Sequence, residues 1–217
     1  MKTLFAVLLG VTLLGTACND PVTDITSDDL TLNQIKGLAL EPLNEGETAA
    51  LLFMREEEKL ARDVYTYLFD KWSVKSFQNI SNSEQTHMDA VLVLIDKYEL
   101  EDPAADNIFG TFQNSDLQRL YDELTDTGSA SMEAALKVGA AIEEIDIIDL
   151  QQALDISVDN QDITIVFENL MKGSRNHLRA FVSNLSTLGI TYEPQYLTQD
   201  DYNAIINSQK ETGGSWW

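Results

Sequence analysis

Apolar residues recur at spacings of three and four along four long stretches of the chain. This spacing places them on one face of a helix and predicts four amphipathic helices. The predicted helices span residues 47–69, 83–98, 131–154 and 162–188. Ser81 or Ser83 is the expected N-cap of the second helix, because serine hydroxyls accept bonds from free backbone N–H groups. Gly189 follows the fourth helix, where glycine favours termination.

Two shorter amphipathic stretches, residues 116–124 and 198–206, predict small helices. No alternation of polar and apolar residues lasts long enough to predict a strand. Short links within each helix pair, and one long connection over residues 99–130, are typical of ferritin-like connectivity. We therefore predict an all-α fold: a ferritin-like four-helix bundle over residues 46–210, with a long crossover connection and a short C-terminal helix.

The first 17 residues have the pattern of a cleaved signal peptide. Lys2 is followed by an apolar run, Leu4–Leu14, that is too short to span a bilayer. Small residues then precede Cys18, as in bacterial lipoprotein signals, although Gly15 replaces the usual leucine. We expect lipidation at Cys18 and an extracytoplasmic protein anchored to the bacterial cell envelope. An ordinary secretory signal with an incidental cysteine is the alternative.

Residues 18–45 are rich in aspartate, proline and threonine and sustain no helical period. They predict an acidic tether that holds the domain away from the membrane. Within it, Ile35–Leu40 is apolar enough to dock on the domain.

Charge and composition exclude several classes of function. The chain has 14 Lys and Arg against 36 Asp and Glu, which gives a formal net charge of −22. No basic cluster is available for nucleic acid, and contact with a membrane is expected only through the lipid anchor. One cysteine and two histidines exclude thiolate-rich zinc sites, so any metal centre must be rich in carboxylates.

The candidate chemistry lies where charged residues interrupt the apolar helix faces. Glu58, Glu84 and Glu143 each fall near the middle of such a face, on three different predicted helices. An unpaired buried carboxylate is costly, and divalent cations offset repulsion between several of them. Both histidines, His87 and His177, also fall on inner faces. Glu84-x-x-His87 projects from one side of its helix and so can bind one metal ion or share its carboxylate between two.

Three short motifs extend this interpretation through a resemblance. Residues 58–65 resemble the Glu-x-x-Ala-Arg-x-x-Tyr motif of the first helix of rubrerythrin-like proteins. Residues 84–87 resemble their second-helix ligand pair. Residues 143–146 resemble their third-helix carboxylates, with Asp146 in place of a second glutamate.

Three longer runs, residues 55–65, 173–181 and 192–197, resemble the ferritin-like family called domain of unknown function 2202. The likeness covers residues 47–206 and implies a fold and a metal site, but no substrate. Mixed oxygen and nitrogen ligands favour iron, with two ions as one option, or manganese or zinc. The implied ligands are Glu58, Glu84, His87, Glu143, Asp146 and His177. A full site would also take a glutamate three residues before His177, where this chain has Ser174.

Several alternatives stay open. Glu57 lies on a second acceptable apolar face and competes with Glu58, which we favour from its register with the motif. Glu144 is expected to be solvated. Arg62 and Arg175 would, as the main alternative, form a metal-free buried salt-bridge network with the carboxylates.

Two function classes follow. The first is an envelope-anchored metal-binding protein for redox or metal handling, with di-iron oxidoreductase activity of the oxidase or peroxidase type as one form. The second is a metal-free helical scaffold or interaction protein of the envelope. Substrate, turnover and oligomeric state, including a homodimer, stay open.

Overall fold

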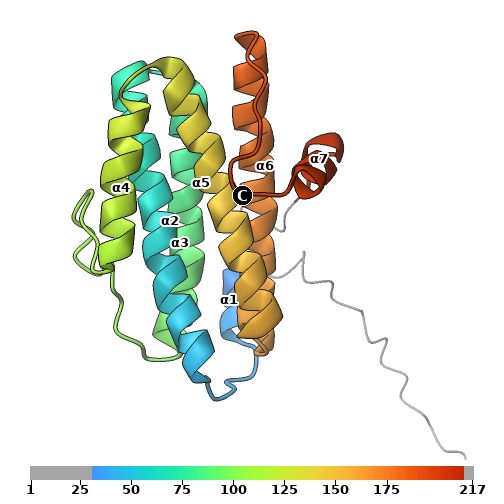
Figure 1. Ribbon diagram of the computed structural model, residues 1–217. Coiled ribbons are helices and arrows are strands. Elements are labelled where there is room, and N and C mark those ends of the chain that lie inside the picture. The colour runs from blue at the N-terminus through green and yellow to red at the C-terminus, as the bar shows by residue number, and fades with distance from the viewer. Residues whose placement is uncertain (1–30, 213–217) are drawn as a thin grey trace, which may run out of the picture.

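The computed structural model describes residues 31–212, which form seven α-helices and no strand (Figure 1). The all-α prediction is confirmed for this part of the chain. The predicted signal peptide and Cys18 lie outside the described residues. The helices are α1 Leu32–Lys36, α2 Glu45–Trp72, α3 Lys75–Lys97, α4 Ser115–Gly128, α5 Met132–Ile156, α6 Gln161–Thr187 and α7 Gln199–Asn207.

The four long helices pack as two hairpins. Helix α2 turns directly into α3 through Ser73, which adopts a left-handed conformation with φ 55°, and α5 turns into α6 through residues 157–160. The hairpins meet where α2 packs on α5 and α3 packs on α6, while α4 covers α2 and α5 from outside (Figure 1). Every long helix therefore presents one face to a common interior.

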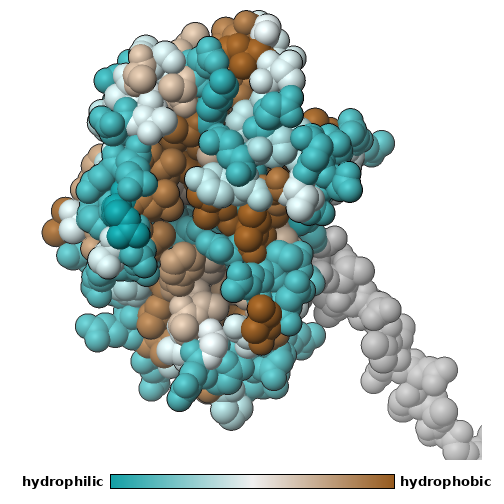
Figure 2. All heavy atoms as spheres, in the orientation of Figure 1, coloured by the Kyte–Doolittle hydropathy of each residue, from teal (hydrophilic) through white to brown (hydrophobic). Residues whose placement is uncertain are grey.

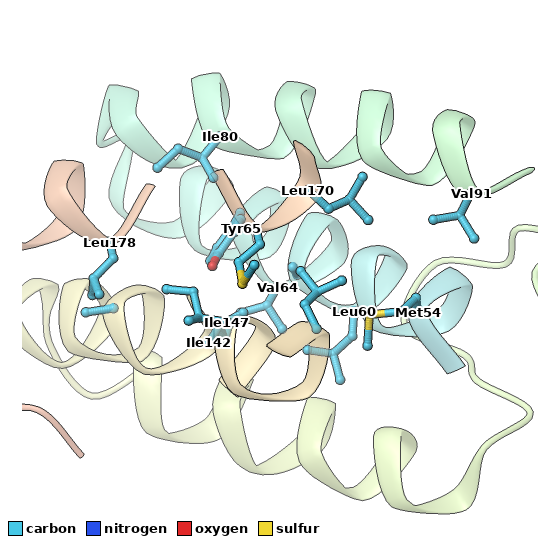
Figure 3. Close-up of a cluster of buried hydrophobic side chains, with 14 of the residues drawn as sticks. Met54, Leu60, Val64, Tyr65, Ile80, Val91, Ile142, Ile147, Leu170 and Leu178 are labelled. Carbon is cyan, nitrogen blue, oxygen red and sulfur yellow. The ribbon is translucent and has the colours of Figure 1, made fainter. Parts of the chain in front are cut away.

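That interior is apolar over most of its length. Figure 3 shows labelled side chains from several helices converging on it, among them Leu60, Tyr65, Ile147 and Leu170, which are all nearly or fully buried. The helices approach closely at Gly139, where a Cβ atom would lie 2.6 Å from the Phe181 ring. The absence of a side chain there lets α5 and α6 pack tightly beside the buried polar residues described below.

The start of the second helix differs from the prediction. Helix α3 begins at Lys75 rather than near Ser83, and Ser81 and Ser83 lie inside it. The apolar face continues through Phe77, which is fully buried, so packing extends the helix across the serines. The Ser81 hydroxyl bonds back to the Gln78 carbonyl and caps no helix.

Part of the predicted tether is folded onto the domain. Helix α1 has a capping box at Thr31, and Ile35 is fully buried, as docking of this stretch predicted. The Lys97 ammonium donates to the carbonyls of Leu38 and Ala39 and holds the chain that follows. Leu40 is 66% exposed, so docking stops before it.

The charged run on α2 anchors the long connection between α3 and α4. Arg55 pairs with Asp102, and the Glu56 carboxylate accepts bonds from two backbone N–H groups, at Gln113 and Asn114. One turn further on, Lys59 donates to the carbonyls of Ile108 and Thr111. The Asp63 carboxylate accepts from the Gly110 N–H and pairs with Lys59 and Arg62.

Glu144 is fully buried, so the prediction that it is solvated was wrong. Its carboxylate accepts bonds from the Tyr192 hydroxyl and from the backbone N–H groups of Gln195, Tyr196 and Leu197. These donors satisfy a buried charge without a cation. One carboxylate on α5 thus holds the segment that leads from α6 into α7.

Replacing Glu144 with alanine should therefore release residues 192–212. We expect a loss of about 2–4 kcal/mol in the free energy of unfolding, because several buried donors lose their acceptor together. Urea denaturation and limited proteolysis between α6 and α7 measure the two effects. Glu193→Ala, at an exposed position of the same segment, is the matched control. A Glu144→Ala protein as stable and protease-resistant as this control would contradict the interpretation.

Candidate metal centre

Five polar residues from all four long helices meet in the apolar interior. Glu58 comes from α2, Glu84 and His87 from α3, Glu143 from α5 and His177 from α6. All but His177 are at most 2% exposed, and the His177 side chain is 11% exposed. The i, i+3 spacing on α3 directs both Glu84 and His87 inward. The structure therefore brings together five of the six residues that the sequence suggested as ligands.

These residues form two overlapping groups. One is Glu58, Glu84 and His87; the other is Glu84, Glu143 and His177; within each group the candidate ligand atoms all lie within 4.8 Å of one another. Glu84 belongs to both. Its Oε2 atom lies 2.7 Å from His87 Nδ1, and its Oε1 atom lies 2.9 Å from His177 Nδ1. The two imidazole rings stack with centroids 5.6 Å apart, one on each side of the shared carboxylate.

The remaining carboxylates complete the two groups. Glu58 Oε2 lies 3.1 Å from His87 Nδ1, and Glu143 Oε2 lies 3.5 Å from His177 Nδ1. Both histidines thus turn the same ring nitrogen toward carboxylate oxygens. The other His177 nitrogen, Nε2, is 3.1 Å from the Ser83 hydroxyl, which fixes the orientation of that ring.

Several of these buried atoms lack a hydrogen-bond partner. They are Glu58 Oε1, Glu84 Oε1, Asp146 Oδ1 and His177 Nδ1. Although Glu84 Oε1 and His177 Nδ1 are close, they are not aligned as a hydrogen bond. An unsatisfied buried polar atom costs about 1–3 kcal/mol, and a cation bound by several such atoms would remove that cost. The donor set of carboxylate oxygens and imidazole nitrogens suits iron, manganese or zinc.

Burial and the neighbouring charges raise the pKa of some residues in the group and lower the pKa of Glu84. Burial raises the pKa of Glu58 and of Glu143, and the neighbouring Glu84 charge raises both further. Burial alone would also raise the pKa of Glu84, but His177 and His87 lower it below its usual range. Burial lowers the pKa of each histidine, yet the adjacent carboxylates outweigh it and raise the pKa of His87 and His177 above the ordinary value.

Tyr65 supports Glu143 from the apolar side. Its hydroxyl lies 2.5 Å from Glu143 Oε1 and is fully buried. Burial and the charge of Glu143 raise the Tyr65 pKa well above its ordinary value, so the hydroxyl keeps its proton and donates it. The second oxygen of Glu143 is thereby left to face His177.

Asp146, the sixth predicted residue, lies beside the two groups and belongs to neither. It accepts a hydrogen bond from Ser174, the residue that stands where a full ferritin-like site has a glutamate. Burial raises the pKa of Asp146 well above its ordinary value, and the charge of Glu58 raises it further. Asp146 and Ser174 thus line the centre together, from α5 and α6.

The side chains named in the two alternatives contact other residues. Glu57 is buried but forms its side-chain hydrogen bond with Asp149, away from His87. Arg62 binds Asp63, Gln85 and Asn107, and Arg175 binds Glu211. The predicted salt-bridge network with Arg62 or Arg175 is therefore wrong, because neither guanidinium reaches these carboxylates.

Sequence reasoning missed two contributors. Asp149, the partner of Glu57, follows Asp146 by three residues, so the spacing on its helix was a usable signal. Ser83, which contacts His177, was interpreted as a helix cap. Its partner is 94 residues away in the sequence, which leaves no local signal.

Comparison with known proteins places the chain in a family. The family described as Uncharacterized protein domain (DUF2202) matches residues 47–209. The chain belongs to the DUF2202 family. Every member of the candidate centre lies within the DUF2202 match. The resemblance seen in residues 55–65, 173–181 and 192–197 is thereby confirmed at the level of this family.

A DUF2202 relative has a solved structure. Uncharacterized protein MJ0754 of Methanocaldococcus jannaschii is 50% identical over 182 residues, which cover 84% of this chain and 98% of that protein. The crystal structure of hypothetical protein MJ0754 from Methanococcus jannaschii DSM 2661 matches with a TM-score of 0.78. That match covers 80% of this chain and 99% of the other.

The pKa shifts predict how pH affects the DUF2202 domain after treatment with a chelator. Glu58, Glu143, Asp146 and the histidines have raised pKa values, so the folded chain binds more protons than the unfolded chain. Their contribution to stability is present at low pH and lost as pH rises through the folded-state pKa values. The melting temperature should fall from about pH 6 to about pH 8.

Bound metal should reverse this trend, because metal binding displaces protons from the same groups. The gain in melting temperature on adding metal should grow over the same pH range. Calorimetry of chelated and loaded protein at matched ionic strength measures both. A pH-independent gain would show that the added metal does not bind these groups.

Proposed function

We propose that this DUF2202 protein is a ferritin-like metal-binding protein with a dinuclear carboxylate–histidine centre. One observation carries the proposal: the two oxygens of Glu84 face two different histidines, each within 3 Å, and each histidine belongs to a separate ligand group. Glu84 would be the residue that holds both ions, because it belongs to both groups. Iron is the proposed metal, with manganese and zinc as alternatives.

The order and packing of the helices support the ferritin-like assignment. Two hairpins, α2–α3 and α5–α6, are joined by the long connection that contains α4 (Figure 1). In ferritin-like carboxylate proteins, ligands project inward from all four helices, with Glu-x-x-His motifs on two of them. This chain has one complete motif, Glu84-x-x-His87, and a partial one in which Ser174 precedes His177.

The surrounding residues suit a buried cation. Glu58 and His87 would complete one coordination group, and Glu143 and His177 the other, with Glu84 shared between them. Tyr65 holds Glu143 and Ser83 holds His177, which keeps both ligands oriented before metal binds. Asp146, hydrogen-bonded to Ser174, is placed to accept or release a proton beside the centre. Bound iron would supply one-electron redox chemistry with oxygen or peroxide.

Partial exposure favours a working centre over a purely structural one. Glu58, Glu84 and His87 are at most 2% exposed, whereas the His177 side chain is 11% exposed. A small oxidant therefore has an edge from which to approach the second group. We extend the proposal to an oxidoreductase of the oxidase or peroxidase type, for which turnover of peroxide by the iron-loaded protein is the test.

Glu84→Ala should abolish most metal binding, and His87→Ala should abolish about half of it. Glu84 is shared by both groups, so its loss should remove both ions, whereas loss of His87 should remove one of about two ions per chain. Elemental analysis after loading measures stoichiometry, and circular dichroism checks that the helices persist. Asp89→Ala removes an exposed carboxylate from the same helix and is the matched control.

The metal-free scaffold predicts a different result. Histidines that only pair with carboxylates would make both variants strongly destabilised, by about 3–5 kcal/mol, with no metal to lose. Wild-type protein that takes up no iron, manganese or zinc and melts at the same temperature with and without chelator would overturn the proposed function. If the protein binds metal, a free metal concentration of 100 times Kd should instead add about 2.7 kcal/mol to the free energy of unfolding.

Anchoring to the cell envelope is a separate proposal that rests on the N-terminal sequence alone. The helices of residues 31–212 include none that is long and apolar enough to cross a membrane. Cys18→Ser should move the protein from the membrane fraction to the soluble extracytoplasmic fraction, because the lipid chains are lost. Cys18→Ala is expected to behave identically, and unchanged fractionation of both variants would contradict a lipid anchor.

A further inference from the structure

A cleft lies between α2 and α5. It has a volume of 540 Å³ and is lined mainly by small and apolar residues, including Ala49, Phe53 and Ala153. Figure 2 shows apolar atoms at the surface between hydrophilic ones on the face of the molecule where α2 and α5 lie in Figure 1. Two acidic residues, Glu56 and Asp149, also line the cleft. Glu56 is occupied by backbone N–H groups, so Asp149 is the acidic group that remains.

Glu57 is a buried neighbour of Asp149. Burial raises the pKa of Glu57, the charges of Asp146 and Asp149 raise it further, and Glu57 is only 3% exposed. Its Oε2 atom is buried and has no hydrogen-bond partner. A structural role does not account for this atom, because an amide side chain in the same place would pair with Asp149 at lower electrostatic cost.

This pair interacts electrostatically with residues of the candidate centre. Glu57 is adjacent in sequence to Glu58, and the charges of Asp146, Asp149 and Glu58 all act on it. On α5, Glu143, Asp146 and Asp149 follow one another at intervals of three, so each is next to the following one on the helix surface. At 1.5 Å per residue, Asp149 lies about 9 Å along the axis from Glu143. Carboxylate side chains therefore occur at successive positions on α5 between Asp149, which lines the cleft, and the candidate ligand Glu143.

We propose that Asp149 and Glu57 form the route by which divalent cations reach the buried centre from the α2–α5 cleft. This inference rests on the proposed metal-binding function. A divalent cation leaves water only where oxygen ligands replace its hydration shell, and a row of carboxylates provides them stepwise. The partly exposed carboxyl of Asp149 receives the ion, and the unpartnered oxygen of Glu57 passes it to Glu58 and Asp146.

The competing route is the edge near His177. Its side chain is 11% exposed and Ser83 lies beside it. That edge offers an imidazole and a hydroxyl, and the carboxylates paired with the imidazole are the candidate ligands Glu84 and Glu143. An oxidant needs no such charges, whereas capture of a cation is accelerated by negative groups at the mouth of a cleft. The α2–α5 cleft would therefore admit cations, and the edge near His177 would admit a small oxidant.

Loading with Co²⁺ alone tests the route, because cobalt bound by carboxylate and imidazole ligands absorbs visible light. Stopped-flow absorbance gives the loading rate of metal-free, full-length protein, and equilibrium titration gives the stoichiometry. Asp149→Asn and Glu57→Gln should each slow loading by about tenfold or more while the final stoichiometry stays that of the wild type. Asp155→Asn is the matched control, since it removes one exposed carboxylate from α5 in a different cleft, that against α7.

The outcomes separate this inference from the proposed function. Wild-type protein that binds no cobalt or other divalent metal would remove the centre itself. If wild type loads but both variants load at its rate, the route is wrong and entry lies at the His177 edge. A lower final stoichiometry in Glu57→Gln would make Glu57 a ligand and also overturn the route. Asp149→Asn keeps the test decisive if Glu57→Gln does not fold, because Asp149 is only partly buried.

Discussion

The structure depends on how buried carboxylates are neutralised. Glu47, Glu56, Asp63 and Glu144 are nearly or fully buried, and each accepts bonds from backbone N–H groups. These bonds join segments distant in sequence: the start of α2 to the start of α6, the long connection to α2, and the C-terminal segment to α5. Acidic side chains therefore act as staples around the outside of the helix pairs.

The carboxylates of the central group are different in kind. Glu58 and Glu84 have no backbone donors, because they face the middle of regular helices whose N–H groups are already bonded. The bonds made by the staples hold connecting segments against α2 and α5, and the four long helices in turn hold the central carboxylates against two histidines. Buried carboxylates thus close the fold where backbone donors are available, and where such donors are absent they form the group that we propose as a cation site.

This distinction explains what could be predicted from the sequence. The five residues of the central group could be predicted to converge, because each interrupts an apolar helix face and that pattern is visible in the local sequence. They are Glu58, Glu84, His87, Glu143 and His177. Glu144 carried no such signal, because its donors are backbone groups about 50 residues further along the chain, and backbone donors have no sequence signature. The start of α3 was missed because Phe77 packs into the core and overrides the capping preference of the serines.

The register of α2 shows why the two halves of the centre differ. Successive residues on a helix are 100° apart, so Glu57 and Glu58 cannot face the same point, and Glu57 turns to Asp149 while Glu58 meets His87. On the opposite side, the short Ser174 side chain stands where a glutamate would complete the motif, and its hydroxyl donates to Asp146. The group around His87 is thus closed, with an acidic pair behind it. The group around His177 lacks its fourth-helix carboxylate and is partly exposed. In the proposed function, this asymmetry would assign metal supply to one side of the centre and small reactants to the other.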